Sequence, residues 1–290
     1  MFIRNVNKTY NKNNVLKNIS FNIENENIVG LVGKNGAGKT TLLKILNGNI
    51  PIYEGDISGF IDKKIASIIE KPKLYENKTG LFNLTFFLKI QDQSIDWKFV
   101  EHLINDFQMQ NFIKRKVSKY SMGMKQLLSL IIAMSQKPEL LILDEPTNGM
   151  DAKNTQKVLI QLTRLTQKYN TVIIITSHKL EEIEQICERV LIMDNGCLIK
   201  DINLKDKVYR KRLSLWFLKK DLNEAISLIE SQHQLINTKG SYVECEIEKD
   251  YYSLLRDLGK KNIYPIKIKE QAYSLKEQYL DNKERFNEHI

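Results

Sequence analysis

The sequence predicts an α/β protein with a mixed, mostly parallel sheet, an antiparallel β-subdomain, a helical subdomain and a small C-terminal α+β domain. Short segments that are apolar on every side, such as residues 28–32 and 140–143, indicate buried parallel strands. Segments with helical periodicity separate these strands. After about residue 212 the order of strands and helices changes, which indicates a second, smaller domain.

The N-terminal segments predict the antiparallel subdomain. Residues 2–10 and 15–23 alternate apolar and polar side chains around the turn-like sequence NKNN at 11–14. This pattern is typical of an antiparallel hairpin. The strand IVGLV at 28–32 follows and opens directly into a glycine-rich loop.

A helical subdomain is predicted over about residues 78–136. In residues 96–109, apolar side chains recur at helical spacing, so they would line one helix face. Residues 127–134, LLSLIIAM, are apolar on all sides, as expected of a buried helix.

From residue 139 the pattern returns to alternating strands and helices. Strands are predicted at 139–145, 171–176 and 189–194, with helices at 152–168 and 179–188 between them. Apolar strands separated by helices indicate a parallel sheet that is covered on both faces.

We divide the chain into a first domain of residues 1–200, a linker at 201–211 and an accessory domain at 212–290. The accessory domain has the βαββαβ order of a ferredoxin-like fold, with its last strand at 263–269. A terminal helix is predicted at 274–286. The alternative is that this segment continues the first domain.

Composition limits the location and the partners. No apolar run approaches the roughly 18 to 20 residues that span a bilayer, and the N-terminus lacks the apolar core of a signal peptide. We therefore expect a cytoplasmic protein. The net charge is +9, but lysines alternate with acids, so we predict no nucleic-acid partner. AT-rich codon usage, or a basic face toward anionic lipids, also explains the excess.

The three cysteines predict neither a metal site nor a redox site. Their number is odd, and Cys187, Cys197 and Cys245 lack the spacing of metal ligands. We expect them to be reduced and to act as small apolar groups.

The sequence GKNGAGKT at 33–40 fits the phosphate-binding loop, with a strand before it and a helix-compatible segment after it. Its glycines let backbone N–H groups face phosphate, and the following helix adds the positive end of its dipole. Lys39 would supply charge to the β- and γ-phosphates, and the Thr40 hydroxyl would bind Mg²⁺. The predicted nucleotide contacts here are Gly33, Asn35, Gly36, Gly38, Lys39, Thr40 and Thr41.

Two carboxylates follow the buried strand at 140–143. Asp144 and Glu145 would emerge at its carboxyl end, where ligands bind in such sheets. Asp144 is suited to Mg²⁺, held largely through water, and Glu145 to a base that activates the attacking water.

Three further segments resemble motifs of the ABC ATPases. YSMGMKQ at 120–126 resembles the ABC signature, usually LSGGQ, at Ser121 and Gly123, although Met122 and Met124 depart from it. NGMD, which ends at Asp151, resembles the D-loop. Ser177 and His178, directly after a strand, resemble the motif of the switch histidine.

Over residues 1–200 the chain is therefore similar to ABC transporter ATPases, which are phosphate-loop NTPases. It most resembles the branch of bacitracin-resistance and lantibiotic-immunity exporters, because SMGMKQ and SIIEKPKLY are typical of that branch. In the second of these segments Glu70 occupies the place of the usual glutamine. Within this branch we single out the ATPases of phenol-soluble-modulin exporters.

The resemblance implies ATP and Mg²⁺ as cofactors and hydrolysis that powers a separate transmembrane permease. It implies a dimer, with itself or a paralogue, in which Ser121 and Gly123 face the partner's γ-phosphate. Tyr10 would stack on the base, which leaves GTP open. His178 would contact the γ-phosphate, Asp151 would contribute to the site, and Glu70 would approach the Mg²⁺.

The resemblance also implies a place on the inner face of the membrane and export of peptides or toxic amphipathic compounds. The alternatives are an ABC ATPase of DNA repair or translation and a purely regulatory nucleotide-binding module. The sequence itself assigns neither the transported substrate nor the role of the accessory domain.

Overall fold

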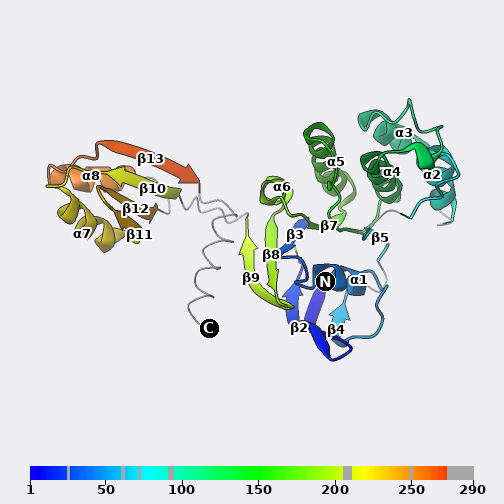
Figure 1. Cartoon of the computed structure of the whole chain (residues 1–290), viewed down its shortest axis with the longest axis horizontal. Helices are drawn as coiled ribbons and strands as arrows, with labels where there is room; N and C mark the ends of the chain where they lie inside the picture. Colours follow the sequence, from blue (N-terminus) through cyan, green and yellow to red (C-terminus); the bar gives the residue numbers. More distant parts are fainter. Residues whose placement is uncertain are drawn as a thin grey trace. The chain divides into compact units, whose positions relative to one another are not determined.

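The chain forms two compact units, Met1–Lys205 and Asp206–Ile290, and each is considered by itself (Figure 1). The structure is a computed structural model, and it describes residues 1–24, 27–59, 63–70, 73–90, 95–204, 211–247 and 251–272. Most of the predicted linker lies outside these residues. That the two units fold independently stays a prediction.

A six-stranded sheet forms the centre of the first unit, with the strand order β5-β6-β7-β3-β8-β9. Its strands are β3 (Ile28–Gly33), β5 (Ile65–Ile68), β6 (Leu140–Leu143), β7 (Val172–Thr176), β8 (Arg189–Asp194) and β9 (Cys197–Asn203). All neighbours are parallel except β8 and β9. The predicted mixed sheet is confirmed. Sequence reasoning missed β9, a partly exposed edge strand without a long apolar run.

A three-stranded antiparallel sheet accompanies it, with the order β2-β1-β4. The strands are β1 (Phe2–Tyr10), β2 (Asn13–Asn22) and β4 (Glu54–Ser58), so the predicted hairpin is present. Strand β4, EGDIS, was not predicted because it is short and polar. Helix α1 (Lys39–Leu46) lies between the two sheets, and its apolar side chains share one core with both (Figure 1).

The predicted helical subdomain contains α2 (Gly80–Lys89), α3 (Trp97–Asp106) and α4 (Met122–Ser135). A 3-10 turn, Val117–Lys119, precedes α4. Each helix begins after a side chain that accepts a hydrogen bond from the backbone N–H three residues later: Thr79, Asp96 and Ser121. Helix α4 is buried from Gln126 to Ser135, and it contacts α2, α3 and β5.

Two more helices cover the parallel sheet. Helix α5 (Ala152–Tyr169) packs on β7, and α6 (Leu180–Ile186) packs on β3 and on α5. Helix α5 ends at Asn170, whose φ of 54° is the left-handed conformation that terminates many helices.

The second unit has a four-stranded antiparallel sheet with the order β11-β12-β10-β13. Its elements are β10 (Lys211–Trp216), α7 (Leu222–Gln232), β11 (Gln234–Lys239), β12 (Tyr242–Ile247), α8 (Tyr252–Lys260) and β13 (Lys267–Ala272). Leu213, Leu215, Val243 and Cys245 share a core with Leu228 and Leu254. The βαββαβ order and this strand arrangement confirm the ferredoxin-like prediction.

The predicted limits of the last strand were wrong. Strand β13 begins at Lys267 and not at residue 263, because Ile263 is buried in the core and Pro265 has no N–H to donate. Pairing starts where the Ile266 N–H donates to the Trp216 carbonyl at 2.7 Å. The predicted terminal helix lies outside the described residues.

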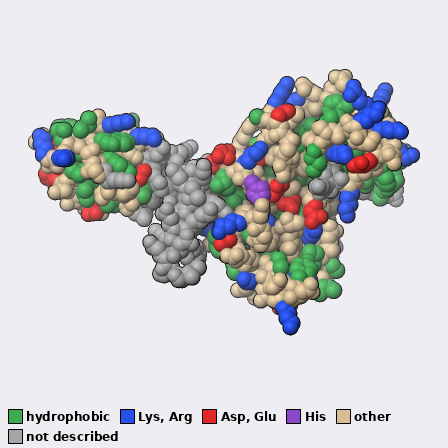
Figure 2. Space-filling view, in the orientation of Figure 1, with side chains coloured by type: hydrophobic (Ala, Val, Ile, Leu, Met, Phe, Trp, Pro, Cys, Tyr) green, Lys and Arg blue, Asp and Glu red, His purple; other side chains and the backbone are tan. Residues whose placement is uncertain are grey.

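The described helices include none with the length and apolar character that crossing a membrane requires. The three cysteines are free thiols. Burial raises the pKa of the Cys187 thiol, and it raises the pKa of Cys245 to about 12, so both stay protonated and pack as apolar groups. On the face drawn in Figure 2, lysines and arginines are interspersed with acidic side chains. Several of these basic side chains lie over the helical subdomain of α2, α3 and α4.

Candidate functional site

The glycine-rich loop joins β3 to α1 in a conformation that depends on two glycines. Gly36 and Gly38 have φ angles of 82° and 98°, which are readily adopted only by glycine. A Cβ at Gly38 would lie 2.8 Å from the Val15 carbonyl oxygen, whereas one at Gly36 would meet no atom within 4 Å. The loop therefore packs tightly on β2 at Gly38 and is open at Gly36. An open loop at a helix N-terminus is suited to phosphate.

Lys39 is held inside this loop. Its side chain is buried, and its Nζ donates to the carbonyl oxygens of Gly33 at 2.8 Å and Lys34 at 3.0 Å. Burial lowers the pKa of Lys39, and the carboxylates of Glu145 and Asp144 oppose that shift. The ammonium is thus already oriented where the loop would bind phosphate.

Asp144 lies next to the loop, as the sequence predicts. Its two carboxylate oxygens accept hydrogen bonds from the hydroxyls of Thr40 at 2.8 Å and Thr176 at 2.6 Å. Sequence reasoning missed Thr176. The signal was present, because Thr176 ends β7, the parallel neighbour of β6, and carboxyl ends of parallel strands meet at one edge.

The oxygens of Thr40 and Asp144 are the hard donors that Mg²⁺ prefers. Among the described residues no group of three or more His, Cys, Asp or Glu side chains could hold a metal. Thr40 and Asp144 thus offer two side chains with oxygen ligands at this edge of the sheet. Such a partial set fits Mg²⁺ bound together with phosphate and water.

Glu145 and His178 meet at the end of β6. The His178 Nε2 atom lies 2.5 Å from Glu145 Oε1, and Asn148 Nδ2 donates to Oε2 at 3.2 Å. Glu145 itself has a φ of 50°, and its N–H donates to Thr176 Oγ1 at 2.9 Å. The two residues predicted to be catalytic are thus in contact, on a backbone in the left-handed region.

Glu70 lies near the same edge, after β5. Its carboxylate pairs with Lys44 Nζ of α1 at 2.5 Å, and this hydrogen bond lowers the pKa of Glu70. The described structure pairs Glu70 with Lys44 and not with the Thr40–Asp144 oxygens, so the predicted metal role stays a prediction. Lys44, missed in the sequence, lies four residues after Thr40, one helical turn along α1.

The signature-like segment starts α4. Ser121 accepts from the Met124 N–H at 3.3 Å, and Met122 is 47% exposed. A Cβ on Gly123 would lie 3.5 Å from the Gly149 carbonyl oxygen, so this segment approaches the D-loop of its own chain.

Asp151 caps α5. Its carboxylate accepts from the Asn154 N–H at 2.7 Å and from the Asn154 side chain at 3.1 Å. Its contribution to a nucleotide site stays a prediction.

A hollow of about 800 Å³ connects the loop region to the helical subdomain. Its lining residues include Tyr10, Thr40, Thr41 and Glu70, together with Phe87, Ile132 and Ala133 of the helical subdomain. Tyr10 is 42% exposed at the end of β1, and Lys8 Nζ lies 4.7 Å from the centre of its ring.

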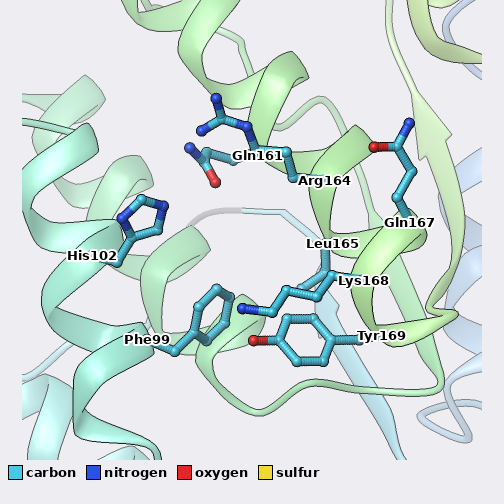
Figure 3. A pocket seen from close by; sticks show the side chains of 8 residues that line it. All are labelled: Phe99, His102, Gln161, Arg164, Leu165, Gln167, Lys168 and Tyr169. Carbon is cyan, nitrogen blue, oxygen red and sulfur yellow. The ribbon is translucent and has the colours of Figure 1, made fainter.

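A second hollow, of about 260 Å³, lies between α3 and α5 (Figure 3). The Phe99 and Tyr169 rings pack edge to face at one end, with centroids 5.2 Å apart. At the other end Arg164 pairs with Asp106 at 3.4 Å. None of the predicted nucleotide residues lines this hollow, so it is separate from the candidate site.

The comparisons with known proteins agree with this geometry. A family model described as ABC transporter matches residues 16–148. The bacitracin transport ATP-binding protein BcrA of Enterococcus faecalis is 33% identical over 241 residues, covering 80% of this chain and 78% of that protein. The lantibiotic transport ATP-binding protein SrtF of Streptococcus pyogenes is 36% identical over 207 residues, covering 68% and 88%.

A solved structure described as the ATP-binding subunit of an ABC transporter also matches the fold. It has a TM-score of 0.62 and 26% identity, and the match covers 71% of this chain and 90% of that one. The narrower resemblance to phenol-soluble-modulin exporter ATPases stays a prediction. The phosphate loop, the paired Glu145 and His178, and these relatives together place the chain in the ABC transporter family, as one of its ATP-binding subunits.

Proposed function

We propose that this chain binds MgATP at the β3–α1 loop and hydrolyses it to power a separate membrane exporter. The observation that carries the proposal is the 2.5 Å contact between Glu145 and His178, beside the Thr40–Asp144 pair. A carboxylate next to a phosphate loop can take the proton of an attacking water, and a histidine bonded to it fixes its orientation.

The remaining residues bind and orient the nucleotide. Lys39 and the loop N–H groups neutralise the phosphates, and Tyr10 stacks on the base. Mg²⁺, held by Thr40 and Asp144 with Glu70 nearby, would offset phosphate charge. The full proposed set of nucleotide contacts is Tyr10, Gly33, Asn35, Gly36, Gly38, Lys39, Thr40, Thr41, Glu70, Ser121, Gly123 and Asp151.

The active form is proposed to be a dimer, with itself or with a paralogue. The exposed N-terminus of α4, with Ser121 and Gly123, would face the partner's γ-phosphate, because a helix N-terminus attracts anions. Each nucleotide would then bridge two chains.

This dimer is expected to form only with the nucleoside triphosphate. In the Glu145→Gln variant, which keeps ATP intact, light scattering should show the mass doubling with MgATP and not with MgADP. Lys39→Ala, with weakened binding, should stay monomeric at the same MgATP concentration. A Glu145→Gln protein that stays monomeric in saturating MgATP would contradict the dimer.

The partner is proposed to be a transmembrane permease that holds the chain on the cytoplasmic face of the membrane. The 800 Å³ hollow supports this, because its lining includes the apolar side chains of Phe87, Ile132 and Ala133 as well as Thr40 and Glu70. Tyr75 stacks on Phe87 and Phe82 packs against Tyr75, and both side chains are partly exposed, so they add to this apolar surface. The names of BcrA and SrtF, which refer to bacitracin and lantibiotic transport, support the proposed export of peptides or toxic amphipathic compounds.

Glu70 is proposed to couple this surface to hydrolysis. Its pairing with Lys44 of α1 joins the end of β5 to the helix that carries Thr40. Glu70→Gln should keep most of the ATPase activity, because its amide oxygen still accepts from Lys44. Glu70→Ala should lower stimulation by the permease more than it lowers ATP affinity.

The measurement compares ATPase rates with and without the co-purified permease in vesicles. Glu139→Ala is the matched control, since Glu139 is an exposed carboxylate at the start of β6, away from this edge. Full stimulation of Glu70→Ala would show that the residue does not transmit the signal.

A further inference from the structure

We propose that Glu182 of α6 is a positioning residue. It holds the segment that carries Glu145 and the segment that carries His178 in fixed positions relative to each other. The inference rests on the proposed role of those two residues in hydrolysis. Glu182 lies in the first turn of α6 and is only 7% exposed, although it carries a carboxylate. A buried carboxylate is costly unless several groups donate to it, so its partners show what it organises.

One oxygen of Glu182 joins two separate chain segments. Oε2 accepts from the Thr147 hydroxyl at 2.6 Å and from the Ser177 hydroxyl at 3.1 Å. Both hydroxyls are buried, with exposures of 3% and 5%. The second oxygen, Oε1, accepts from Lys179 Nζ at 2.9 Å, so the charge has a cationic partner at the surface.

The two segments are the ones that carry the proposed catalytic pair. Thr147 lies two residues after Glu145, and Ser177 immediately precedes His178. Ser177 Oγ also accepts from the Lys179 N–H at 3.0 Å, which closes a tight turn around His178. The carboxylate therefore ties the chain on both sides of the 2.5 Å contact.

This tie is needed because the contact is not held by regular structure. Glu145 has left the β6 ladder with a φ of 50°, and His178 lies between β7 and α6. Each side chain is partly exposed, 27% for Glu145 and 46% for His178. A misplacement of about 1 Å in such a site can slow a reaction about 100-fold.

The competing explanation is that Glu182 only stabilises α6, as an acid near a helix N-terminus. Glu181 provides the matched control. It carries the same charge in the same turn of α6, but it is exposed. If Glu182 acts only through the helix dipole, Glu181→Ala and Glu182→Ala should lower kcat for ATP hydrolysis equally. If Glu182 is a positioning residue, only Glu182→Ala should lower kcat.

The test measures ATPase kinetics and nucleotide affinity of the full chain. Glu182→Ala should lower kcat about 10- to 100-fold while the dissociation constant for ATP changes less than about twofold. Glu182→Gln should restore most of kcat, because a single amide oxygen can accept from both hydroxyls. Thr147→Val and Ser177→Ala should each reproduce part of the loss. In a His178→Ala background, Glu182→Ala should add little, since both act on one contact.

A second readout is independent of hydrolysis. The imidazole NMR cross-peak of His178, assigned by its loss in His178→Ala, should move in Glu182→Ala toward its position in Glu145→Ala. It should stay in place in Glu182→Gln and Glu181→Ala. An unmoved cross-peak in folded Glu182→Ala, or a loss of ATP affinity equal to the loss of kcat, would overturn the proposal. If the unsubstituted protein binds ATP but does not hydrolyse it, the proposed function is wrong. The position of the His178 cross-peak still tests the role of Glu182 in that case.

Discussion

Glu145→Gln is expected to lose ATP hydrolysis by about 100- to 10,000-fold while it keeps its affinity for ATP. The substitution removes the proton acceptor at the end of β6 and preserves the shape of the side chain. Its amide can still contact His178 and Asn148, the partners of the carboxylate. Phosphate release under saturating MgATP measures the loss, and binding of a fluorescent ATP analogue measures affinity.

Glu181→Gln is the control for a general effect of lost negative charge, since Glu181 is exposed on α6. It should hydrolyse ATP at the parental rate. Turnover of Glu145→Gln within a few-fold of the parent would remove Glu145 from the role of base and point to another acceptor in the site.

Lys39→Ala is expected to weaken MgATP binding about 10- to 100-fold. A hydrogen bond to a charged group contributes about 1.5–3 kcal/mol, and about 1.4 kcal/mol corresponds to a factor of ten. The effect falls on binding because the ammonium is already placed inside the loop by the carbonyls of Gly33 and Lys34. Isothermal titration with a non-hydrolysable ATP analogue and Mg²⁺ gives the dissociation constant.

Lys34→Ala is the matched control in the same loop. Lys34 is exposed, and its Nζ lies 4.0 Å from an Asp194 carboxylate oxygen, so its loss should change affinity less than twofold. If both variants bind the ATP analogue equally weakly, the total charge of the loop governs binding, and not the position of the Lys39 ammonium group. A melting curve of each variant separates loss of affinity from loss of folding.

The sequence predicts best those parts of the fold and the site that depend on a local pattern. The apolar run Leu140–Leu143 implied a buried strand, and a buried strand places Asp144 and Glu145 at its carboxyl end. The glycine positions of the loop likewise reflect a backbone conformation that few other residues adopt.

Contacts between distant segments were not predictable in the same way. The Lys44–Glu70 pair and the Thr176–Asp144 bond depend on how α1, β5, β6 and β7 align in three dimensions. Sequence periodicity contains no register between strands that lie about 30 residues apart, such as Ile142 and Ile174. The polar strand β4 was missed for a related reason. Its side chains show no strand pattern, and it is a strand because its backbone pairs with β1.

The left-handed backbone at Glu145 has a consequence for engineering this protein. A residue with a Cβ is about 1–2 kcal/mol less stable in that conformation than in the right-handed one, whereas glycine is not penalised. At position 145, glycine would therefore favour thermal stability, whereas ATP hydrolysis requires glutamate. A screen that selects for thermal stability without measuring ATPase activity would favour Glu145→Gly, and the selected proteins would be stable but inactive. Stabilising changes are better sought at residues that take no part in the site, for example in the apolar core of the ferredoxin-like unit.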